Sequence, residues 1–114
     1  MSDLILTING IADFESRVLA ASHTQPIVVD FWADWCGPCL FLAPSLEAVT
    51  QEYDGAVLLA KVDTEEDENL KLAGRYKVRG FPTVVLINKG EEIARFSGNK
   101  TKPFIREFID PHVN

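Results

Sequence analysis

The stretch Trp35-Cys36-Gly37-Pro38-Cys39 decides the fold, and it contains both cysteines of the chain, set three residues apart. The run 27–33 before it is apolar, as in a buried strand, and apolar residues at helical spacing follow it. A C-x-x-C motif between a strand and a helix is typical of a redox site. At a helix start the first cysteine meets unpaired N–H groups and the positive end of the helix dipole, which favour the nucleophilic thiolate. The second cysteine lies near enough to form a disulfide with the first.

The composition indicates one folded domain, 1–114. Of the 114 residues, 46% are hydrophobic and 25% are charged, as in ordinary globular proteins. The net charge of −6 argues against nucleic acid and anionic membranes as partners, because both attract clustered Lys and Arg. We see neither an apolar run of the ~20 residues that span a bilayer nor a signal peptide, so we expect a cytoplasmic protein.

Apolar periodicity outside the motif predicts alternating strands and helices. The predicted strands are 4–8, 27–33, 57–62, 83–87 and 92–97, the last two joined by a tight turn. The predicted helices are 11–21, 40–53 with a kink at Pro44, about 63–73, and 104–109. The order βαβαβαββα predicts an α/β fold with a parallel core, an antiparallel hairpin and helices on both faces of the sheet.

The acidic cluster 63–68 lacks the alternating ligand pattern of a calcium loop. Acidic side chains favour the first turn of a helix, so we expect this cluster to begin a helix that ends near Gly74. A zinc site would need four protein ligands, and His23 and His112 are the only histidines available beside the cysteines. They are far apart in the sequence, so we expect no metal.

Along nearly its whole length the chain resembles the thioredoxin family. The segments that carry this resemblance are 30–39 with Ala43-Pro44, 61–63, 80–83 and Gly98. It implies a thioredoxin fold, with a central five-stranded mixed sheet flanked by four helices. The family usually has a basic residue after the second cysteine, and this chain has Leu40, followed by Phe41 and Leu42. We therefore expect a slightly less stabilised thiolate and a more apolar surface beside the motif.

The resemblance implies dithiol–disulfide exchange. Cys36 would attack a substrate disulfide, and Cys39, expected to be the less exposed, would resolve the mixed disulfide. Burial of Asp30 in an apolar strand should raise its pKa, and the resemblance makes it the acid/base for Cys39. Lys61 is similar to the family lysine that modulates this aspartate. The alternatives are a structural, hydrogen-bonded Asp30 and a lysine that reaches solvent from an edge strand.

A substrate groove is also implied by the resemblance. Pro82 is expected to follow a cis peptide bond, which would place the backbone of Phe81 beside Cys36, free to pair with an extended substrate segment. Trp32 is expected to support the motif from the core. The implied substrate-binding residues are Trp35, Gly37, Pro38, Gly80, Phe81, Pro82 and Gly98.

The function expected is a general protein-disulfide reductase, because the Gly37-Pro38 pair resembles the reducing members of the family. Such a monomer needs no bound cofactor and receives electrons from NADPH through a thioredoxin reductase. The alternative is a redox-active domain of a co-chaperone that binds unfolded clients, suggested by residues 40–42 and 108–112. An exported oxidant would need a signal sequence.

Overall fold

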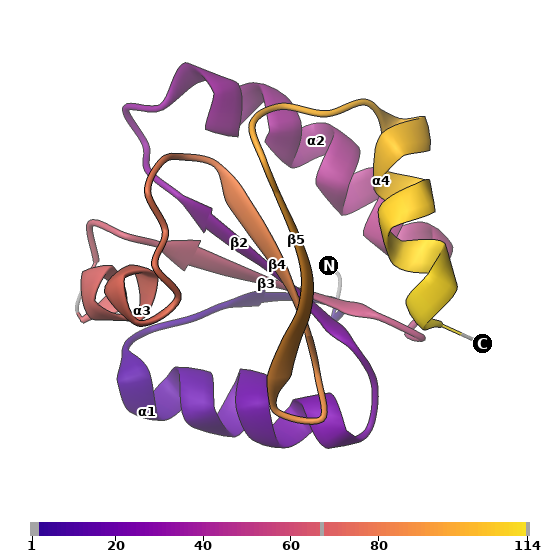
Figure 1. The fold of residues 1–114 in the computed structure, drawn as a ribbon, viewed down its shortest axis with the longest axis horizontal. Helices are drawn as coiled ribbons and strands as arrows, with labels where there is room; N and C mark the ends of the chain where they lie inside the picture. Colours follow the sequence, from indigo (N-terminus) through magenta and orange to yellow (C-terminus); the bar gives the residue numbers. More distant parts are fainter. Residues whose placement is uncertain (1–2, 67, 114) are drawn as a thin grey trace.

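A five-stranded sheet runs through the structure, a computed structural model that describes residues 3–66 and 68–113 (Figure 1). Its strands are β1 (Ile5–Thr7), β2 (Ile27–Trp32), β3 (Leu58–Asp63), β4 (Thr83–Asn88) and β5 (Glu91–Ser97). They lie in the order β1-β3-β2-β4-β5, in which β1, β3 and β2 are parallel. β4 runs antiparallel to β2, and β5 runs antiparallel to β4. The predicted parallel core with an antiparallel hairpin is confirmed.

Helices cover both faces of this sheet because its central strand, β2, is apolar on both. Its alternate residues Ile27, Val29 and Phe31 pack into one core, and Val28 packs into the other. Figure 1 shows α1 and α3 on one side of the sheet and α2 and α4 on the other. The bounds are α1 (Ile11–Phe14), α2 (Gly37–Glu52), α3 (Asn69–Arg75) and α4 (Lys102–Ile109). None of the helices within the described ranges is long and apolar enough to cross a membrane.

The first predicted helix, 11–21, changes its winding along its length. After α1 the chain continues in wider π-type turns over Glu15–Ala20 and a 3-10 turn over Ala21–His23. Phe14 and Val18 are nevertheless both fully buried. The apolar face predicted from their spacing is therefore directed at the core throughout.

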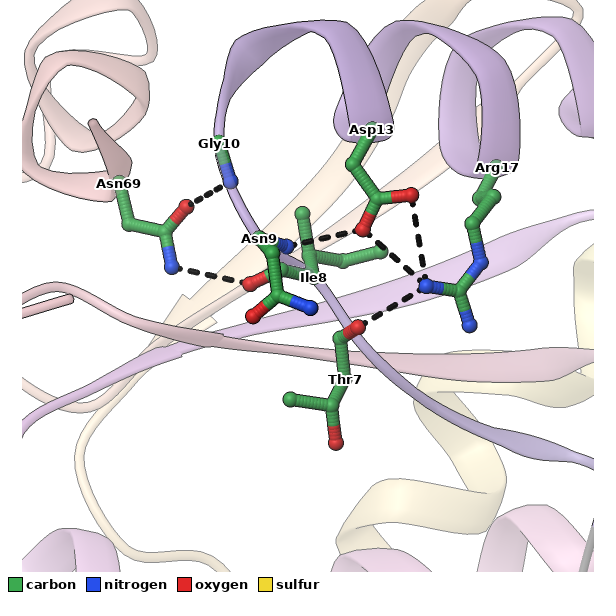
Figure 2. A network of polar contacts seen from close by, with 7 residues as sticks. All are labelled: Thr7, Ile8, Asn9, Gly10, Asp13, Arg17 and Asn69. Atoms are coloured by element: carbon green, nitrogen blue, oxygen red, sulfur yellow. Dashed lines mark hydrogen bonds and ion pairs between the residues drawn. The ribbon is translucent and has the colours of Figure 1, made fainter. Parts of the chain in front are cut away.

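The prediction that residues 63–68 form the first turn of a helix is wrong for the residues that the structure describes; Asp67 lies outside them. Asp63 still belongs to β3, where it pairs with Trp32, and a turn follows before α3 begins at Asn69. The buried Asn69 side chain is bonded to the backbone of Ile8 and Gly10 (Figure 2). It is also bonded to the backbone of Asp63, and together these bonds hold the start of the helix in place. α3 then runs through Gly74 to Arg75.

The helix α2 begins at Gly37 with Cys36 as its N-cap, so the expected helix start at the first cysteine is confirmed. It begins three residues before the predicted range 40–53. Pro38 in its first turn has no N–H to satisfy, which suits that position. Pro44 lies inside the helix, which continues to Glu52. The start of α2 therefore coincides with the C-x-x-C motif, directly beyond the end of β2.

Candidate active site

The two cysteines form a disulfide at the N-terminus of α2, with their Cα atoms 5.3 Å apart. Cys36 has an extended backbone, and its Sγ accepts a hydrogen bond from the backbone N–H of Cys39 at 3.1 Å. This N–H is one of those that a helix start leaves without an intrahelical partner. Once the disulfide is reduced, the same N–H and the helix dipole stabilise negative charge on Cys36 Sγ.

Both cysteines are almost buried, with exposed fractions of 4% for Cys36 and 2% for Cys39. They cluster with Ala33, and the partly buried rings of Trp32 and Phe81 pack against them. The difference in exposure between the two cysteines has the expected direction but is small. A reaction partner must therefore approach Cys36 closely, over the residues that surround it.

Asp30 lies on the face of β2 that α2 covers and is only 1% exposed. Its Oδ1 atom has no hydrogen-bond partner among the described residues, which disfavours a purely structural, hydrogen-bonded aspartate. Burial raises the pKa of Asp30 to about 7, while the Lys61 charge lowers this pKa and the Glu47 charge raises it. The carboxyl group can therefore exchange a proton near neutral pH.

Lys61 is the direct neighbour of Asp30 across the β2–β3 pair. The edge-strand alternative for this lysine is wrong, because β3 is paired with β1 on one side and β2 on the other. Its Nζ lies 2.8 Å from Glu47 Oε2 and 5.4 Å from the centre of the Trp32 ring. The position of the lysine is thus set by α2 as well as by its own strand.

Glu47 is a residue of this site that the sequence analysis missed. It lies on α2 and is the first charged residue after Asp34. That long uncharged interval is the signal that could have singled it out. Its role required the knowledge that α2 packs over β3, which brings Glu47 to Lys61.

The Phe81–Pro82 peptide bond is cis, as predicted. The Phe81 ring meets the Trp35 ring edge-on, with their centres 5.8 Å apart. The N–H of Gly98 donates to the carbonyl oxygen of Pro82 at 2.9 Å, and the Thr83 hydroxyl donates to the carbonyl of Gly80 at 2.6 Å. The fold therefore brings the distant segments 80–83 and 97–98 together, and Phe81 joins them to the cysteines.

The surface around the disulfide is largely apolar. Trp35 is 66% exposed, and its indole N–H donates to Glu65. Gly37 and Pro38 are exposed as well, and beyond them Leu40 and Phe41 are 53% and 75% exposed. A protein that approaches Cys36 therefore meets little charge along α2.

The two histidines do not join this site. His23 and His112 line one surface pocket of about 650 Å³, together with Lys89. His23 lies before the start of β2, whereas Cys36 follows its end, so the pocket and the disulfide are at opposite ends of that strand. Within the described ranges, no group of three or more His, Cys, Asp or Glu side chains could hold a metal ion.

Comparison with known proteins gives a consistent result. The family model described as Thioredoxin matches residues 6–111. Thioredoxin of Acidithiobacillus ferridurans is 40% identical over 113 residues, covering 99% of this chain and 100% of that protein. Thioredoxin of Pseudomonas aeruginosa is 37% identical with the same coverage.

Solved structures agree with these sequence matches. The X-ray structure of Fasciola hepatica thioredoxin has a TM-score of 0.83 and 38% identity, covering 94% of this chain and 98% of that one. A mutant thioredoxin from Halobacterium salinarum has a TM-score of 0.84 and 29% identity, covering 98% of this chain and 93% of that one. The predicted five-stranded sheet with four flanking helices is thus shared with proteins of this kind.

Proposed function

Because the chain belongs to the thioredoxin family, we propose that it is a general reductase of protein disulfides. It is a protein-disulfide oxidoreductase, and its chemistry is dithiol–disulfide exchange through Cys36 and Cys39. The observation that carries the proposal is the Cys36–Cys39 disulfide at the start of α2, where a backbone N–H is already directed at Cys36 Sγ.

Cys36 is the attacking residue in the reduced protein. Its thiolate displaces one sulfur of a substrate disulfide, so that a Cys36–substrate disulfide forms and the leaving thiolate takes up a proton. The helix start favours Cys36 as the nucleophile, because its Sγ is the sulfur that accepts the N–H of Cys39. Trp35, Gly37 and Pro38, which adjoin Cys36 in the chain and are exposed, contact the substrate.

Cys39 completes the reaction. Asp30 takes the proton of the Cys39 thiol, and the resulting thiolate attacks Cys36 Sγ, releasing the second substrate thiolate and closing the Cys36–Cys39 disulfide. The pKa of about 7 suits Asp30 to this task, since a general base works best near the operating pH. Lys61 modulates Asp30 through its positive charge.

An extended substrate segment lies along the cis-proline loop in this proposal. Phe81 offers its backbone groups to the segment, and Gly80, Pro82 and Gly98 leave room for close approach. The carbonyl of Pro82 is held by Gly98, which keeps the loop next to the cysteines. Substrates of many sequences can bind in this way, because backbone pairing does not read side chains.

Electrons come from NADPH through a thioredoxin reductase, which reduces the Cys36–Cys39 disulfide after each turnover. The protein itself needs no bound cofactor, because the two thiols carry both electrons. A reductant of this kind belongs in the cytoplasm, where thiols are kept reduced. It acts as a monomer, since all of the proposed catalytic groups lie on one chain.

Insulin reduction by NADPH and a thioredoxin reductase tests the proposal. We expect turnover with the unmodified protein and none with Cys36→Ser, because no nucleophile remains. Cys39→Ser should instead accumulate a Cys36–insulin disulfide, visible on a non-reducing gel. Absence of NADPH oxidation by the unmodified protein would refute the reductase.

The exposed Leu40 and Phe41 favour one alternative, a domain that binds unfolded clients. That function would not need the thiols, so a Cys36→Ser/Cys39→Ser variant should still suppress client aggregation. Suppression by this variant without insulin reduction by the unmodified protein would favour the alternative.

A further inference from the structure

The first two turns of α2 carry an exposed surface without charge. No charged residue lies between Asp34 and Glu47, although charged residues make up 25% of the chain. Leu40 and Phe41 are among its largest exposed apolar side chains, at 53% and 75%. We call these two residues the α2 apolar pair.

The pair has no part in the core of the protein. α2 packs on the sheet through the fully buried side chains of Leu42, Leu46 and Val49. Leu40 and Phe41 belong to none of the buried clusters of the described residues. Fold stability therefore does not require two large apolar side chains at these positions.

The pair lies one helical turn from the start of α2, where Cys36 is. The N–H of Leu40 donates to the carbonyl oxygen of Cys36 at 3.2 Å, so Leu40 is one helical turn from Cys36. Phe41 is placed in the same way relative to Gly37, four residues before it. A protein whose sulfur reaches the almost buried Cys36 therefore comes within about one helical turn of this part of α2.

From this position we infer that Leu40 and Phe41 select substrates whose reactive cysteine is flanked by large apolar side chains. The occupant is the extended segment of the substrate that carries the disulfide, because this surface is continuous with the one where exchange takes place. Acidic residues lie on the other side of the motif, where Asp34 precedes Trp35 and Glu65 accepts its indole N–H. The inference rests on the proposed reductase function and adds a substrate class to it.

Two disulfide substrates of matched chemistry test this selection. Each is a peptide joined by one disulfide to the same fluorescent cysteine, and its own cysteine is flanked either by Leu and Phe or by Ser and Gln. Second-order rate constants are measured with the pre-reduced protein, so that no reductase takes part. The ratio of the two rate constants is the readout, because a change in Cys36 reactivity cancels in it.

We expect the unmodified protein to react roughly tenfold faster with the apolar peptide, since apolar side chains leave water on contact with the pair. Leu40→Gln and Phe41→Gln should each lower this preference by about threefold, and the double variant should nearly abolish it. Phe41→Leu should retain most of it. The matched control is Ile93→Gln, which changes an apolar residue that is 40% exposed. Ile93 lies at the bulge of β5, at the other end of the β4–β5 pair from the cis-proline loop, so this variant should leave the ratio unchanged.

An unchanged ratio in the double variant would overturn the inference while leaving the reductase intact. Failure of the unmodified protein to release the fluorescent cysteine from either peptide would refute the reductase, and the inference with it. Both substitutions are at exposed positions and introduce a good helix former, so folded variants are expected.

Discussion

Asp30, Lys61 and Glu47 interact electrostatically, although they come from β2, β3 and α2. Lys61 could neutralise Asp30 directly, since the two are cross-strand neighbours. Its Nζ instead lies 2.8 Å from Glu47 Oε2. Glu47 thus pairs with the Lys61 cation, and its own charge adds to the burial that raises the Asp30 pKa.

Glu47→Gln should therefore lower the pKa of Asp30 below the present value of about 7. It removes a negative charge and frees Lys61 to approach the carboxylate, and both changes favour the ionised form. Lys61→Met should have the opposite effect, because the cation that favours the carboxylate is lost. A carbon-detected NMR titration of the Asp30 carboxyl group measures both shifts.

The control for this prediction is Glu52→Gln on the same helix, whose partner Arg106 lies at the surface. It should leave the pKa of Asp30 unchanged. A rise in the Asp30 pKa in Glu47→Gln would show that Glu47 does not position Lys61.

At the scale of secondary-structure elements, Asn69 joins three segments that are distant in sequence. Its Oδ1 accepts the N–H of Gly10 at 2.9 Å, and its Nδ2 donates to the carbonyl of Ile8 at 3.0 Å (Figure 2). The same Nδ2 donates to the carbonyl of Asp63 at 2.9 Å. It thereby connects the β1–α1 turn, the end of β3 and the start of α3. The turn after β3 includes Glu65, which accepts the Trp35 indole N–H, so this network also supports the active-site surface.

Asn69→Ala should lower the free energy of unfolding by about 3 kcal/mol, because buried backbone groups lose their partners. Urea denaturation monitored by circular dichroism measures this loss. Asn99→Ala, at an exposed asparagine, is the control and should change stability by less than about 0.5 kcal/mol. Equal effects of the two substitutions would mean that the network contributes nothing to stability.

On the other side of α1, Asp13 and Arg17 continue the network of Figure 2. Asp13 Oδ2 accepts the N–H of Asn9 at 2.8 Å, and Arg17 donates to Asp13 and to the carbonyl of Thr7. These contacts are exposed and screened by solvent, so each contributes less than the buried Asn69 bonds. The turn that leads into α1 is thus stabilised mainly by Asn69 at the start of α3.

For the molecule as a whole, Asp30 makes stability depend on pH. Its pKa is raised from 3.8 to about 7 in the folded state, so the folded protein binds this proton more tightly than the unfolded chain. The stabilisation is complete below about pH 4 and is lost as pH rises to about 7, an effect on the order of 4 kcal/mol. The reductase thus carries a buried acid at the expense of stability near neutral pH.

Asp30→Asn removes this dependence and should make the protein more stable than the unmodified one at about pH 8. The difference in unfolding free energy between the two proteins should shrink markedly at about pH 5, because Asp30 is then largely protonated when folded. Urea denaturation at both pH values measures it. Glu52 and Glu92 have lowered pKa values, so they make the protein more stable as pH rises. Both proteins contain these two residues, so their contributions cancel in the difference.

If the difference in unfolding free energy between Asp30→Asn and the unmodified protein did not change with pH, the assignment of the raised pKa to Asp30 would be contradicted. The same variant should resolve mixed disulfides more slowly, because it lacks the base that we propose for Cys39. Stability and turnover are therefore expected to change in opposite directions at this residue.

The sequence by itself determined the element order, the central strand and the redox pair. The spacing of apolar residues sets which side chains can share a face of a helix or strand, so β2 and the cores on both sides of it were predictable. Asp30 was identified in the same way, as a single carboxylate within an apolar run. The start of a helix at Cys36 was expected from the motif, although the apolar spacing itself begins only at residue 40. The turn after Asp63 was missed, because it depends on side-chain bonds such as those of Asn69.

The tertiary structure alone decided which distant residues meet. Packing of α2 over β3 brought Glu47 to Lys61, and it left Leu40 and Phe41 outside while Leu42 was buried. The sequence predicted a more apolar surface beside the motif but left open how many of residues 40–42 face solvent. Local conformation follows from neighbours in the chain, whereas exposure, charge pairing and the Asp30 pKa follow from elements that meet only in the folded protein.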